Sequence, residues 1–217
     1  MFLKRFSSLT LVAAIVIAVA GSGEPASCTE AAAQEQNLAL LKRIDADLAK
    51  KPDNTLLQLQ HAEVMGLLKR YDEQIAEASR LITKNPKLRD AYLIKSDGEA
   101  NQKRYTEALA SLEKAICLGA ANPGLLMSKS RYLMHLKRYD EAIKFLGNVI
   151  VLEPSNSDAY QGRAICYMNS FGPCAEALKD MEKVVLLRPL DSSAKEMVAV
   201  LKRELALNRS THASGGK

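Results

Sequence analysis

The chain has 217 residues, of which 47% are hydrophobic and 25% are charged, a composition typical of a globular protein and not of a disordered one. Aromatic residues make up only 5%, Trp is absent, and Ala, Leu, Lys and Glu are abundant, so propensity favours helices over strands. The formal net charge of +5 argues against a nucleic-acid partner, because such a protein usually concentrates a much larger basic field on one face.

Residues 1–20 have the pattern of a secretory signal peptide. Lys4 and Arg5 form a basic start, and an uncharged, mostly apolar run continues to Ala20. Ala18 and Ala20 form the small-x-small pattern that a signal peptidase recognises. The run is shorter than the ~20 residues that span a bilayer. We therefore expect cleavage after Ala20 and a periplasmic or secreted protein; the alternative is a membrane-anchored chain with an uncleaved N-terminus.

Residues 21–28 form a predicted linker that ends at Cys28. A lipidated Cys28 would tether the protein to a membrane through acyl chains. Pro25, Ala26 and Ser27 precede this cysteine, however, and a bacterial lipobox instead resembles Leu-Ala-Gly-Cys directly after the apolar run. We therefore expect an unmodified Cys28, with lipidation as the alternative.

Residues 29–52 contain a predicted amphipathic helix. Leu38, Leu41, Ile44 and Leu48 fall on one stripe at helical spacing. We expect this helix to pack on the unit that follows, as the second helix of a degenerate half repeat.

An internal repeat dominates the rest of the chain. The segments LKRYDEQIAEA, QKRYTEALASL and LKRYDEAIKFL place Tyr71, Tyr105 and Tyr139 at a constant interval of 34 residues. The stretches before and after each Lys-Arg-Tyr triplet have helical periodicity. Each unit is therefore predicted to be two antiparallel helices joined by a short turn.

Proline marks the ends of these units. Pro52 and Pro86 are also 34 residues apart, and Pro154 lies two such intervals after Pro86, with Ala120 in the intermediate place. Proline suits this position because it cannot donate a hydrogen bond into a continuing helix.

This pattern resembles the tetratricopeptide repeat, which has a 34-residue helix-turn-helix period, an aromatic residue at the turn, small residues at helix contacts and a closing proline. The resemblance implies an all-α, right-handed α-solenoid of about four repeats. We assign the repeats to residues 55–88, 89–122, 123–156 and 157–191. The small contact residues are Ala62, Ser96, Ser130 and Ala164 in first helices and Ala108, Ala142 and Ala177 in second helices.

The chain also departs from the family pattern. The Gly usual two places before the turn Tyr is Lys69, Lys103 or Lys137, and Gln74 stands where Ala is expected. In the fourth repeat, the turn sequence NSFGPC carries one extra residue and Cys174 replaces the Tyr. We expect that turn to be irregular.

The C-terminal flank contains a predicted capping helix over residues 192–209. Ser193 and Glu196 form a capping-box pattern ahead of an apolar stripe. A cap of this kind covers the apolar face that the next repeat would otherwise bury. Residues 210–217 are short, polar and Gly-containing, and we expect a disordered tail.

In the family that the repeats resemble, first helices form a concave wall that binds peptides. Projected onto this chain, that wall consists of Leu56, Leu59, Glu63, Leu67, Asp90, Leu93, Asp97, Asn101, Met127, Arg131, Met134, His135, Asp158, Gln161, Ile165 and Met168. The wall combines flexible apolar side chains with a few charges, so we expect it to bind an amphipathic helix or an extended peptide with apolar anchors. An alternative assignment for the Met and Leu stripe is packing between helices.

No catalytic, cofactor or metal motif is found in the sequence. It lacks a Gly-rich phosphate loop, a Gly-x-Ser-x-Gly elbow and a His-Glu-x-x-His helix. His61, His135 and His212 lie in different units or in the tail, which favours separate histidines over a metal site. We therefore expect a protein that is not an enzyme and has no cofactor.

Cys166 and Cys174 flank the turn of the fourth repeat. Facing helices can bring two such residues to the ~5.5 Å Cα separation of a disulfide, and export would permit that bond. The alternatives of a disulfide and of two packed thiols both stay open. An accessory redox protein that uses these two cysteines is one alternative function.

The turns carry a recurring basic pair, for example Lys103 and Arg104. A row of such pairs could contact anionic lipids or an acidic partner. Acidic residues just downstream, such as Glu107, offset the charge locally. We therefore expect solvated turns, and we do not favour membrane association.

Together these features predict an exported scaffold or adaptor that binds partner proteins or peptides in its concave groove. The other alternative is a membrane-tethered component of an envelope assembly or secretion machine. The sequence does not identify the partner, the biological process or the oligomeric state.

Overall fold

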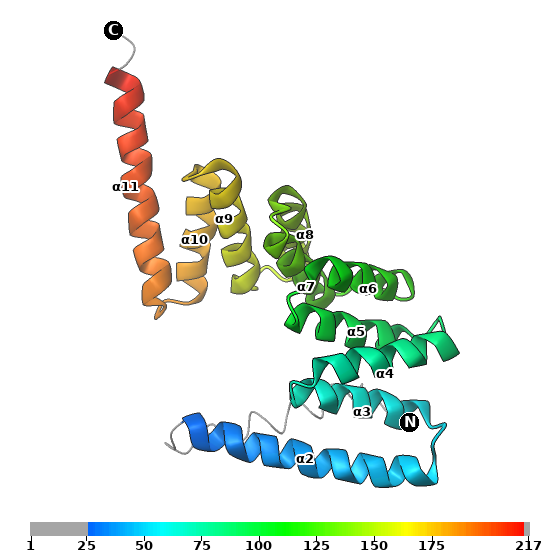
Figure 1. Cartoon of the computed structure of the whole chain (residues 1–217). Helices are drawn as coiled ribbons and strands as arrows, with labels where there is room; N and C mark the ends of the chain where they lie inside the picture. Colours follow the sequence, from blue (N-terminus) through cyan, green and yellow to red (C-terminus); the bar gives the residue numbers. More distant parts are fainter. Residues whose placement is uncertain (1–25, 215–217) are drawn as a thin grey trace, which may run out of the picture.

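The computed structural model describes the backbone of residues 26–214 and the side chains of residues 30–208. Within this part all regular secondary structure is helical (Figure 1). The helices are α2 (Ala26–Lys50), α3 (Thr55–Leu67), α4 (Tyr71–Lys84), α5 (Arg89–Asn101), α6 (Tyr105–Cys117), α7 (Pro123–His135), α8 (Tyr139–Leu152), α9 (Ser157–Phe171), α10 (Ala175–Leu187) and α11 (Ser192–Ser214). The predicted signal peptide and the side chain of Cys28 lie outside the described residues.

The helices form a row of hairpins stacked in chain order. The hairpins are α3 with α4, α5 with α6, α7 with α8, and α9 with α10, and the second helix of each packs on the first helix of the next. Helix α2 packs on α3 at one end, and α11 packs on α10 at the other (Figure 1). This arrangement confirms the predicted all-α repeat fold with flanking helices.

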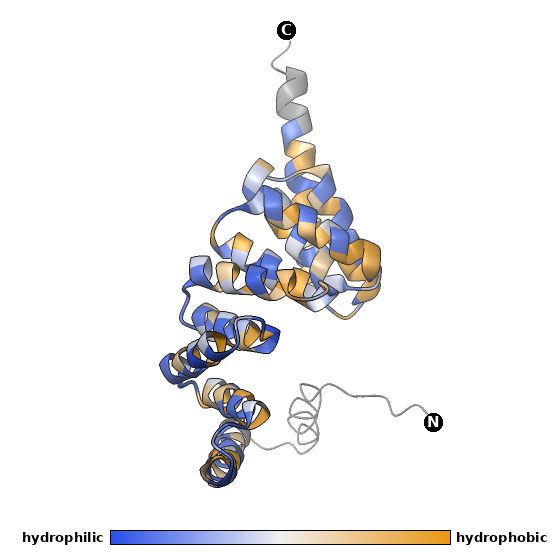
Figure 2. Ribbon diagram, turned by 90° about the vertical axis from the view of Figure 1, so that its right-hand side faces the viewer, coloured by the Kyte–Doolittle hydropathy of each residue, from blue (hydrophilic) through white to orange (hydrophobic). Residues whose placement is uncertain are grey.

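Small residues allow the helices to approach one another closely. The seven predicted contact residues, from Ala62 to Ala177, are all at most 1% exposed. Two of them are serines, which tolerate burial because their hydroxyls are satisfied: Ser96 Oγ donates to the Ala108 carbonyl at 2.8 Å, and Ser130 Oγ donates to the Leu126 carbonyl at 2.8 Å. Buried hydrophobic residues of neighbouring helices form clusters along the stack, and Figure 2 shows hydrophobic positions on the ribbons of these helices. The core therefore consists of layers between neighbouring helices.

The first helices of the first three repeats end in the same backbone motif. In the second repeat, the Lys103 N–H donates to the Ala100 carbonyl and the Arg104 N–H donates to the Glu99 carbonyl, both at 2.9 Å, which is a Schellman motif. Lys69, Lys103 and Lys137 have φ values of 61°, 62° and 58°. The left-handed conformation at this position explains why the family usually has Gly there.

Asparagine begins three of the four first helices. Asn54, Asn122 and Asn156 each accept a hydrogen bond through Oδ1 from a backbone N–H of the first turn, at 2.9 to 3.2 Å. These bonds satisfy donors that the helix itself leaves without a partner.

The second helices begin with an ion pair in the first three repeats. Arg104 Nε lies 3.3 Å from Glu107 Oε1, and Arg138 Nε lies 2.6 Å from Glu141 Oε1, with Arg70 and Glu73 paired in the same way. The arginines of the turns are therefore neutralised locally.

Two predicted boundaries were wrong. Helix α2 begins at Ala26 and not at residue 29, because no proline follows Pro25 until Pro52 and nothing from Ala26 onward opposes a helix. Helix α11 continues to Ser214 and not to residue 209, so the tail predicted from 210 is partly helical. After Pro189, the next residues that strongly disfavour a helix are Gly215 and Gly216, which come after the end of α11.

The connection between α6 and α7 differs from the other connections between repeats. It lacks the closing proline and has Ala120 in its place. Arg89, the first residue of α5, holds it in place: Nη2 donates to the Ala120 carbonyl at 2.8 Å, and Nε donates to the Ala115 carbonyl at 3.2 Å. A Cβ atom on Gly119 would lie 2.9 Å from Arg89 Cδ, so a side chain at this position would displace the end of the Arg89 side chain.

The turn of the fourth repeat is irregular, as predicted from its extra residue. Helix α9 extends to Phe171, and Gly172, with a φ of 74°, ends it in place of the turn Lys. Cys174 then occupies the residue before α10. A bidentate ion pair holds this hairpin together: Arg163 contacts the buried Asp180 at 2.7 and 2.8 Å.

Candidate binding groove

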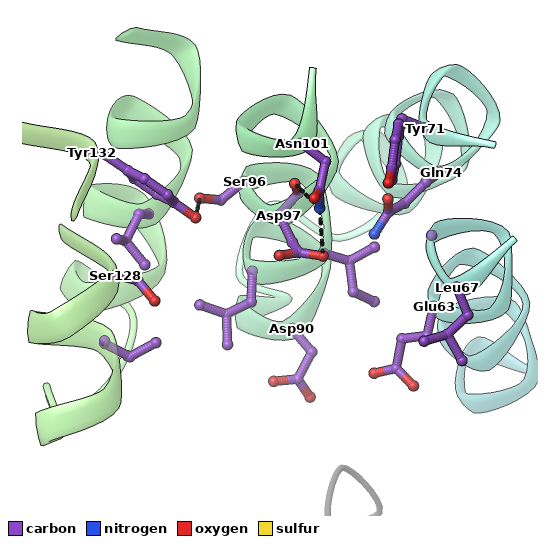
Figure 3. A pocket seen from close by; sticks show the side chains of 15 residues that line it. Glu63, Leu67, Tyr71, Gln74, Asp90, Ser96, Asp97, Asn101, Ser128 and Tyr132 are labelled. Atoms are coloured by element: carbon purple, nitrogen blue, oxygen red, sulfur yellow. Dashed lines mark hydrogen bonds between the residues drawn. The ribbon is translucent and has the colours of Figure 1, made fainter. Parts of the chain in front are cut away.

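A groove of about 580 Å³ lies across the first three repeats. Helices α3, α5 and α7 contribute most of its lining, and Tyr71 and Gln74 of α4 reach it from behind (Figure 3). The lining residues are Glu63, Gly66, Leu67, Tyr71, Gln74, Asp90, Leu93, Ile94, Ser96, Asp97, Asn101, Leu112, Leu125, Ser128 and Tyr132. Three neighbouring first helices border this space. Its volume therefore suits an extended or helical segment of a partner protein.

The floor of the groove is built around Gln74. This side chain is only 2% exposed and lies between two glycines of the first helices, Gly66 on α3 and Gly98 on α5. A Cβ on Gly66 would lie 2.7 Å from Gln74 Nε2, and a Cβ on Gly98 would lie 3.0 Å from Gln74 Oε1. The glycines therefore make room for an amide where the other repeats have Ala.

The amide of Gln74 is only partly satisfied. It hydrogen-bonds to Asp97, which favours the charged form of that carboxyl, whereas Gln74 Oε1 is buried and has no hydrogen-bond partner. A buried acceptor without a partner costs about 1–3 kcal/mol.

The charged residues of the lining are all acidic. Glu63, Asp90 and Asp97 carry carboxylates, and the lining contains no Lys, Arg or His. Desolvation, reinforced by the negative charge of Asp90, raises the pKa of Glu63. Desolvation also raises the pKa of Asp97, against the opposing effects of the Gln74 hydrogen bond and the charge of Arg131. The groove thus has a negative potential in a chain whose net charge is +5.

Apolar side chains lie beside these carboxylates. Leu67 is 44% exposed, and Leu93 and Leu125 are half-buried. Asn101 Nδ2 donates to the backbone carbonyl of Asp97 at 2.9 Å, which holds the Asn101 side chain beside Asp97 (Figure 3). The groove therefore offers apolar contacts and acceptors within one space.

Six of the sixteen residues predicted for the concave wall line this groove, and the other ten do not. The six are Glu63, Leu67, Asp90, Leu93, Asp97 and Asn101. The ten are Leu56, Leu59, Met127, Arg131, Met134, His135, Asp158, Gln161, Ile165 and Met168.

Several of the ten pack in the core. Leu59 is 8% exposed and belongs to a cluster with Ala62, Ala78 and other residues between α3, α4 and α5. Met127 and Met134 pack against the core cluster of the third repeat, and Met168 packs against that of the fourth. These four residues therefore take part in packing between helices, the alternative assignment for the Met and Leu stripe, and their contact with a partner stays a prediction.

The remaining predicted residues have other surroundings. The His135 ring stacks on that of Tyr105, with 4.1 Å between centroids. Arg131 is exposed and lies over the ring of Tyr132, and Asp158 pairs with Arg188 at the end of α10. Gln161 and Ile165 are half-buried, and Leu56 is 55% exposed at the start of α3.

The predicted wall omitted some residues that line the floor of the groove, because the prediction used a projection of the first helices only. Tyr71 and Gln74 belong to a second helix, and the Tyr132 ring lies at the far side. The departure of Gln74 from the expected Ala was the signal that could have placed it, because a large polar residue in a slot for small ones needs space and partners.

Cys166 and Cys174 are free thiols in the structure, which corresponds to the alternative of two packed thiols. The two residues belong to different layers: Cys166 packs in the cluster with Leu133 and Leu146, whereas Cys174 packs against the cluster with Met181. Burial raises the pKa of Cys166 to about 11. A thiol of that pKa is a poor nucleophile near neutral pH, which speaks against redox use of Cys166.

No cluster of three or more His, Cys, Asp or Glu within the described residues could hold a metal ion. Each helix between residues 26 and 214 is too short or too polar to cross a bilayer.

Comparison with known proteins agrees with the geometry. Residues 100–164 match the family model described as tetratricopeptide repeat. None of the curated proteins matches the chain.

Solved structures share the fold at low sequence identity. The chain is similar to YrrB, described as a TPR protein with an unusual peptide-binding site, with a TM-score of 0.65 and 17% identity over 75% of this chain and 84% of that one. It is similar to MamA from Desulfovibrio magneticus RS-1, with a TM-score of 0.66 and 16% identity over 74% and 90% of the two chains. The first TPR of Spaghetti (RPAP3), bound to the HSP90 peptide SRMEEVD, gives a TM-score of 0.50 and 24% identity over 54% of this chain and 93% of that one.

Proposed function

We propose that this tetratricopeptide-repeat protein is a non-enzymatic, extracytoplasmic scaffold that binds a peptide segment of a partner protein in the groove between α3, α5 and α7. The observation that carries the proposal is the groove itself, in which the exposed Leu67 and three carboxylates face one space on a stack of packed hairpins. Binding surfaces formed by rigid elements lose little entropy when a partner docks.

The composition of the groove supports binding and not catalysis. Leu67, Leu93 and Leu125 offer apolar surface to anchor side chains, and the acidic residues offer hydrogen-bond acceptors that set orientation. The lining contains no His, Cys or Lys, and the hydroxyl of its buried Ser96 donates to the Ala108 carbonyl and not to a base. The peptide-binding sites named for YrrB and for the RPAP3 repeat belong to proteins of the same fold, and they motivate the same class of ligand here.

The extracytoplasmic location rests on residues 1–20. A basic start, a short apolar run and the small residues Ala18 and Ala20 are the features of a cleaved signal peptide. The mass of the N-terminal peptide from native cells tests this part of the proposal. A mature chain that begins at Gly21 and is soluble supports it, whereas a lipidated Cys28 or a retained Lys4 and Arg5 would replace it with the tethered alternative.

Selection from a displayed peptide library tests the binding function. We expect peptides that bind the wild-type chain and lose binding to Leu67→Ser, because Leu67 is an exposed groove residue. The matched control is Leu152→Ser, which removes a leucine that is 59% exposed outside the groove. Selected peptides that bind both variants equally would place the binding site elsewhere and contradict the proposal.

A further inference from the structure

We propose that the side of the stack where α8 and α10 end binds an anionic lipid surface, with exposed apolar side chains entering the bilayer and lysines contacting the head groups. This surface is separate from the groove between α3, α5 and α7. The inference therefore goes beyond the proposed function and does not rest on it.

The first argument is the position of the most exposed apolar side chains. Leu190, Val151 and Leu186 are 95%, 79% and 71% exposed, more than any other large hydrophobic residue among those described. With Leu152 they form a surface that we call the apolar edge, at the ends of α8 and α10 and in the connection to α11. Both helices end on the same side of the stack (Figure 1). Exposed apolar side chains gathered in this way mark an interaction surface.

The repeat itself brings the members of the apolar edge together. Val151 and Leu186 are 35 residues apart, the length of the fourth repeat, so they take equivalent places in neighbouring second helices. Ile150 and Leu186 line one hollow, which shows that the ends of α8 and α10 are neighbours. The equivalent residues of the first two repeats are Thr83 and Cys117. Large apolar side chains at this place are thus confined to the last two repeats.

The second argument is the charge of that hollow, which has a volume of about 420 Å³ and lies between α8 and α10. Its two carboxylates already have partners. Asp180 pairs with Arg163 at 2.7 Å, and Glu182 pairs with Lys202 at 2.8 Å. The acidic residues of the lining are therefore neutralised within the chain.

Lys179 and Lys183 give the hollow its excess positive charge. Both belong to the lining, and neither forms an ion pair with another described residue. Together with Leu186 they occupy positions i, i+4 and i+7, on one stripe of α10. The lysines and the apolar edge therefore face the same surroundings.

The spacing along α10 matches the layers of a membrane. At a rise of about 1.5 Å per residue, Lys183 lies about 4.5 Å and Lys179 about 10 Å before Leu186 along the helix axis. The head-group region is roughly 5–8 Å thick on each side of a bilayer. When Leu186 enters the hydrocarbon, Lys183 is at the depth of the head groups, and the long stem of Lys179 reaches them. Helix α8 has the same order, with the exposed Lys144 two turns before Val151.

The shape of the apolar edge favours a lipid surface over a protein. A protein partner holds an anchor side chain in a well-packed pocket of complementary shape. Leu186 and Leu190 instead protrude into water with little of their surface covered. A bilayer accepts such side chains without a matching shape, and anionic lipids attract the lysines. A second copy of the same surface would be repelled by its own lysines.

The basic pairs of the turns do not contribute to this surface. They lie at the opposite ends of the second helices, where Arg104 and Arg138 pair with glutamates. The expectation that these turns are solvated is therefore compatible with a membrane contact on the other side of the stack.

The test measures flotation of the full chain with vesicles of phosphatidylcholine, alone or in an equimolar mixture with phosphatidylglycerol. We expect at least about tenfold tighter binding to the anionic vesicles, because each lysine near such a surface contributes about fivefold. The preference should weaken at high salt. All variants share residues 1–28, so any contribution of the N-terminus is the same in each of them.

Paired lysine variants test the charge. Lys179→Gln combined with Lys183→Gln should remove most of the preference for anionic vesicles. The matched control is Lys103→Gln combined with Lys137→Gln, which removes two exposed lysines of the turns and should leave the preference unchanged.

Apolar variants test insertion. Leu186→Ser combined with Leu190→Ser should weaken binding to anionic vesicles at least about fivefold, because buried apolar area is lost. Phe171→Ser is the control, since Phe171 is 67% exposed at the other side of the stack, where α9 ends. These positions are exposed, so the variants are expected to fold.

A fluorescent probe reports the depth of the apolar edge. The chain contains no Trp, so Leu190→Trp introduces a single one. Its emission should shift to shorter wavelength on anionic vesicles and be quenched by lipids brominated in their acyl chains. Phe171→Trp should show neither change.

Three outcomes would overturn the inference. The first is equal binding to neutral and anionic vesicles, or binding to neither. The second is a preference that persists in the variant of Lys179 and Lys183, since the attraction would then arise elsewhere, for example from the N-terminus. The third is an unquenched Leu190→Trp, which would leave the apolar edge to a protein partner. Peptide binding in the groove should be the same in all these variants, so failure of this inference leaves the proposed function standing.

Discussion

The side chain of Gln74 occupies the space that a Cβ atom on Gly66 would need, since such an atom would lie 2.7 Å from Gln74 Nε2. In the next two repeats the position of Gln74 is taken by Ala108 and Ala142, and the position of Gly66 is taken by Ala100 and Met134. In the first repeat the larger side chain thus comes from the second helix, whereas in the other two the first helix carries a side chain in place of Gly. The first repeat keeps its packing and gains an amide in the groove.

This exchange predicts coupling between the two positions. Gly66→Ala alone should destabilise the chain by about 1–2 kcal/mol, because the methyl group collides with a buried side chain. In a Gln74→Ala background the same change should stabilise by up to about 1 kcal/mol, since Ala favours the helix over Gly. Denaturant unfolding of the four members of the cycle gives the coupling energy, expected at about 1–3 kcal/mol.

Gly147→Ala is the control for that cycle. Gly147 lies inside α8. A Cβ atom there would meet nothing closer than Nη1 of Arg163 on α9, at 3.7 Å, which is an ordinary van der Waals contact. It should stabilise the chain to the same extent with Gln74 or with Ala at position 74. A coupling near zero between positions 66 and 74 would show that Gln74 moves aside at no cost.

Lys137→Gly should stabilise the chain by about 0.5–1 kcal/mol. Lys137 has a φ of 58°, a conformation that costs a residue with a Cβ about 1–2 kcal/mol, and the larger entropy of Gly in the unfolded chain offsets part of the gain. Thermal and denaturant unfolding measure the change. Lys144→Gly removes an equally exposed lysine from the interior of α8 and should instead destabilise by about 1 kcal/mol. The same sign for both variants would contradict the conformational explanation.

Glu63→Gln should raise the stability of the chain at neutral pH. Because the pKa of Glu63 is raised in the folded state above its ordinary value of 4.5, the folded chain binds more protons than the unfolded one between these two values. The wild-type stability contributed by this group therefore falls as pH rises through that window. We expect the variant to gain less than about 1 kcal/mol at pH 7, because solvent screens the half-buried carboxylate, and the gain should vanish below the ordinary pKa.

Glu73→Gln should change the stability at neutral pH in the opposite direction, by lowering it. The hydrogen bond from Arg70 lowers the pKa of Glu73, so its contribution to stability is present above the ordinary pKa and is lost as pH falls through the lowered one. Unfolding at pH 7 and at pH 3.5 therefore distinguishes the two variants. A loss of stability in Glu63→Gln at pH 7 would show that Glu63 has a favourable partner in the free chain.

Ala142→Arg should destabilise the chain by more than about 3 kcal/mol, because Ala142 is fully buried between α7 and α8 and a charged side chain cannot be accommodated there. Circular dichroism during heating measures the loss. Asn148→Arg, an exposed position of the same helix, should stay within about 0.5 kcal/mol of the wild type. Unchanged melting of Ala142→Arg would show that the hairpin opens to admit the side chain.

The repeat architecture could be predicted from the sequence because it depends on local and periodic signals. Tyr71, Tyr105 and Tyr139 mark the turns, and residues such as Ala108 and Ala142 mark the close contacts, so the spacing alone defines the hairpins. The left-handed turn lysines were visible as departures from the family pattern. Their conformation shows that the backbone motif at the turn prevails over the residue type.

The position of the groove could be predicted only in part. Glu63 and Asp97 were placed correctly in the hollow because they are polar residues on the concave side of α3 and α5. Met134 and Met168 do not line this hollow and pack partly against neighbouring helices, because an apolar residue at the same helical position can turn toward a neighbour. The contribution of Gln74 depends on two glycines of other helices, Gly66 on α3 and Gly98 on α5.

The connection between α6 and α7 affects the distance between the two sides of the groove. The lining on α3 and α5 lies on one side of this joint and the lining on α7 lies on the other, while Arg89 holds the connection through two carbonyl oxygens. Any rotation of the last two repeats about that point changes the distance between the two walls. The width of the groove therefore depends on a connection that lies outside its lining, and a substitution of Arg89 is expected to change that width without changing any lining residue.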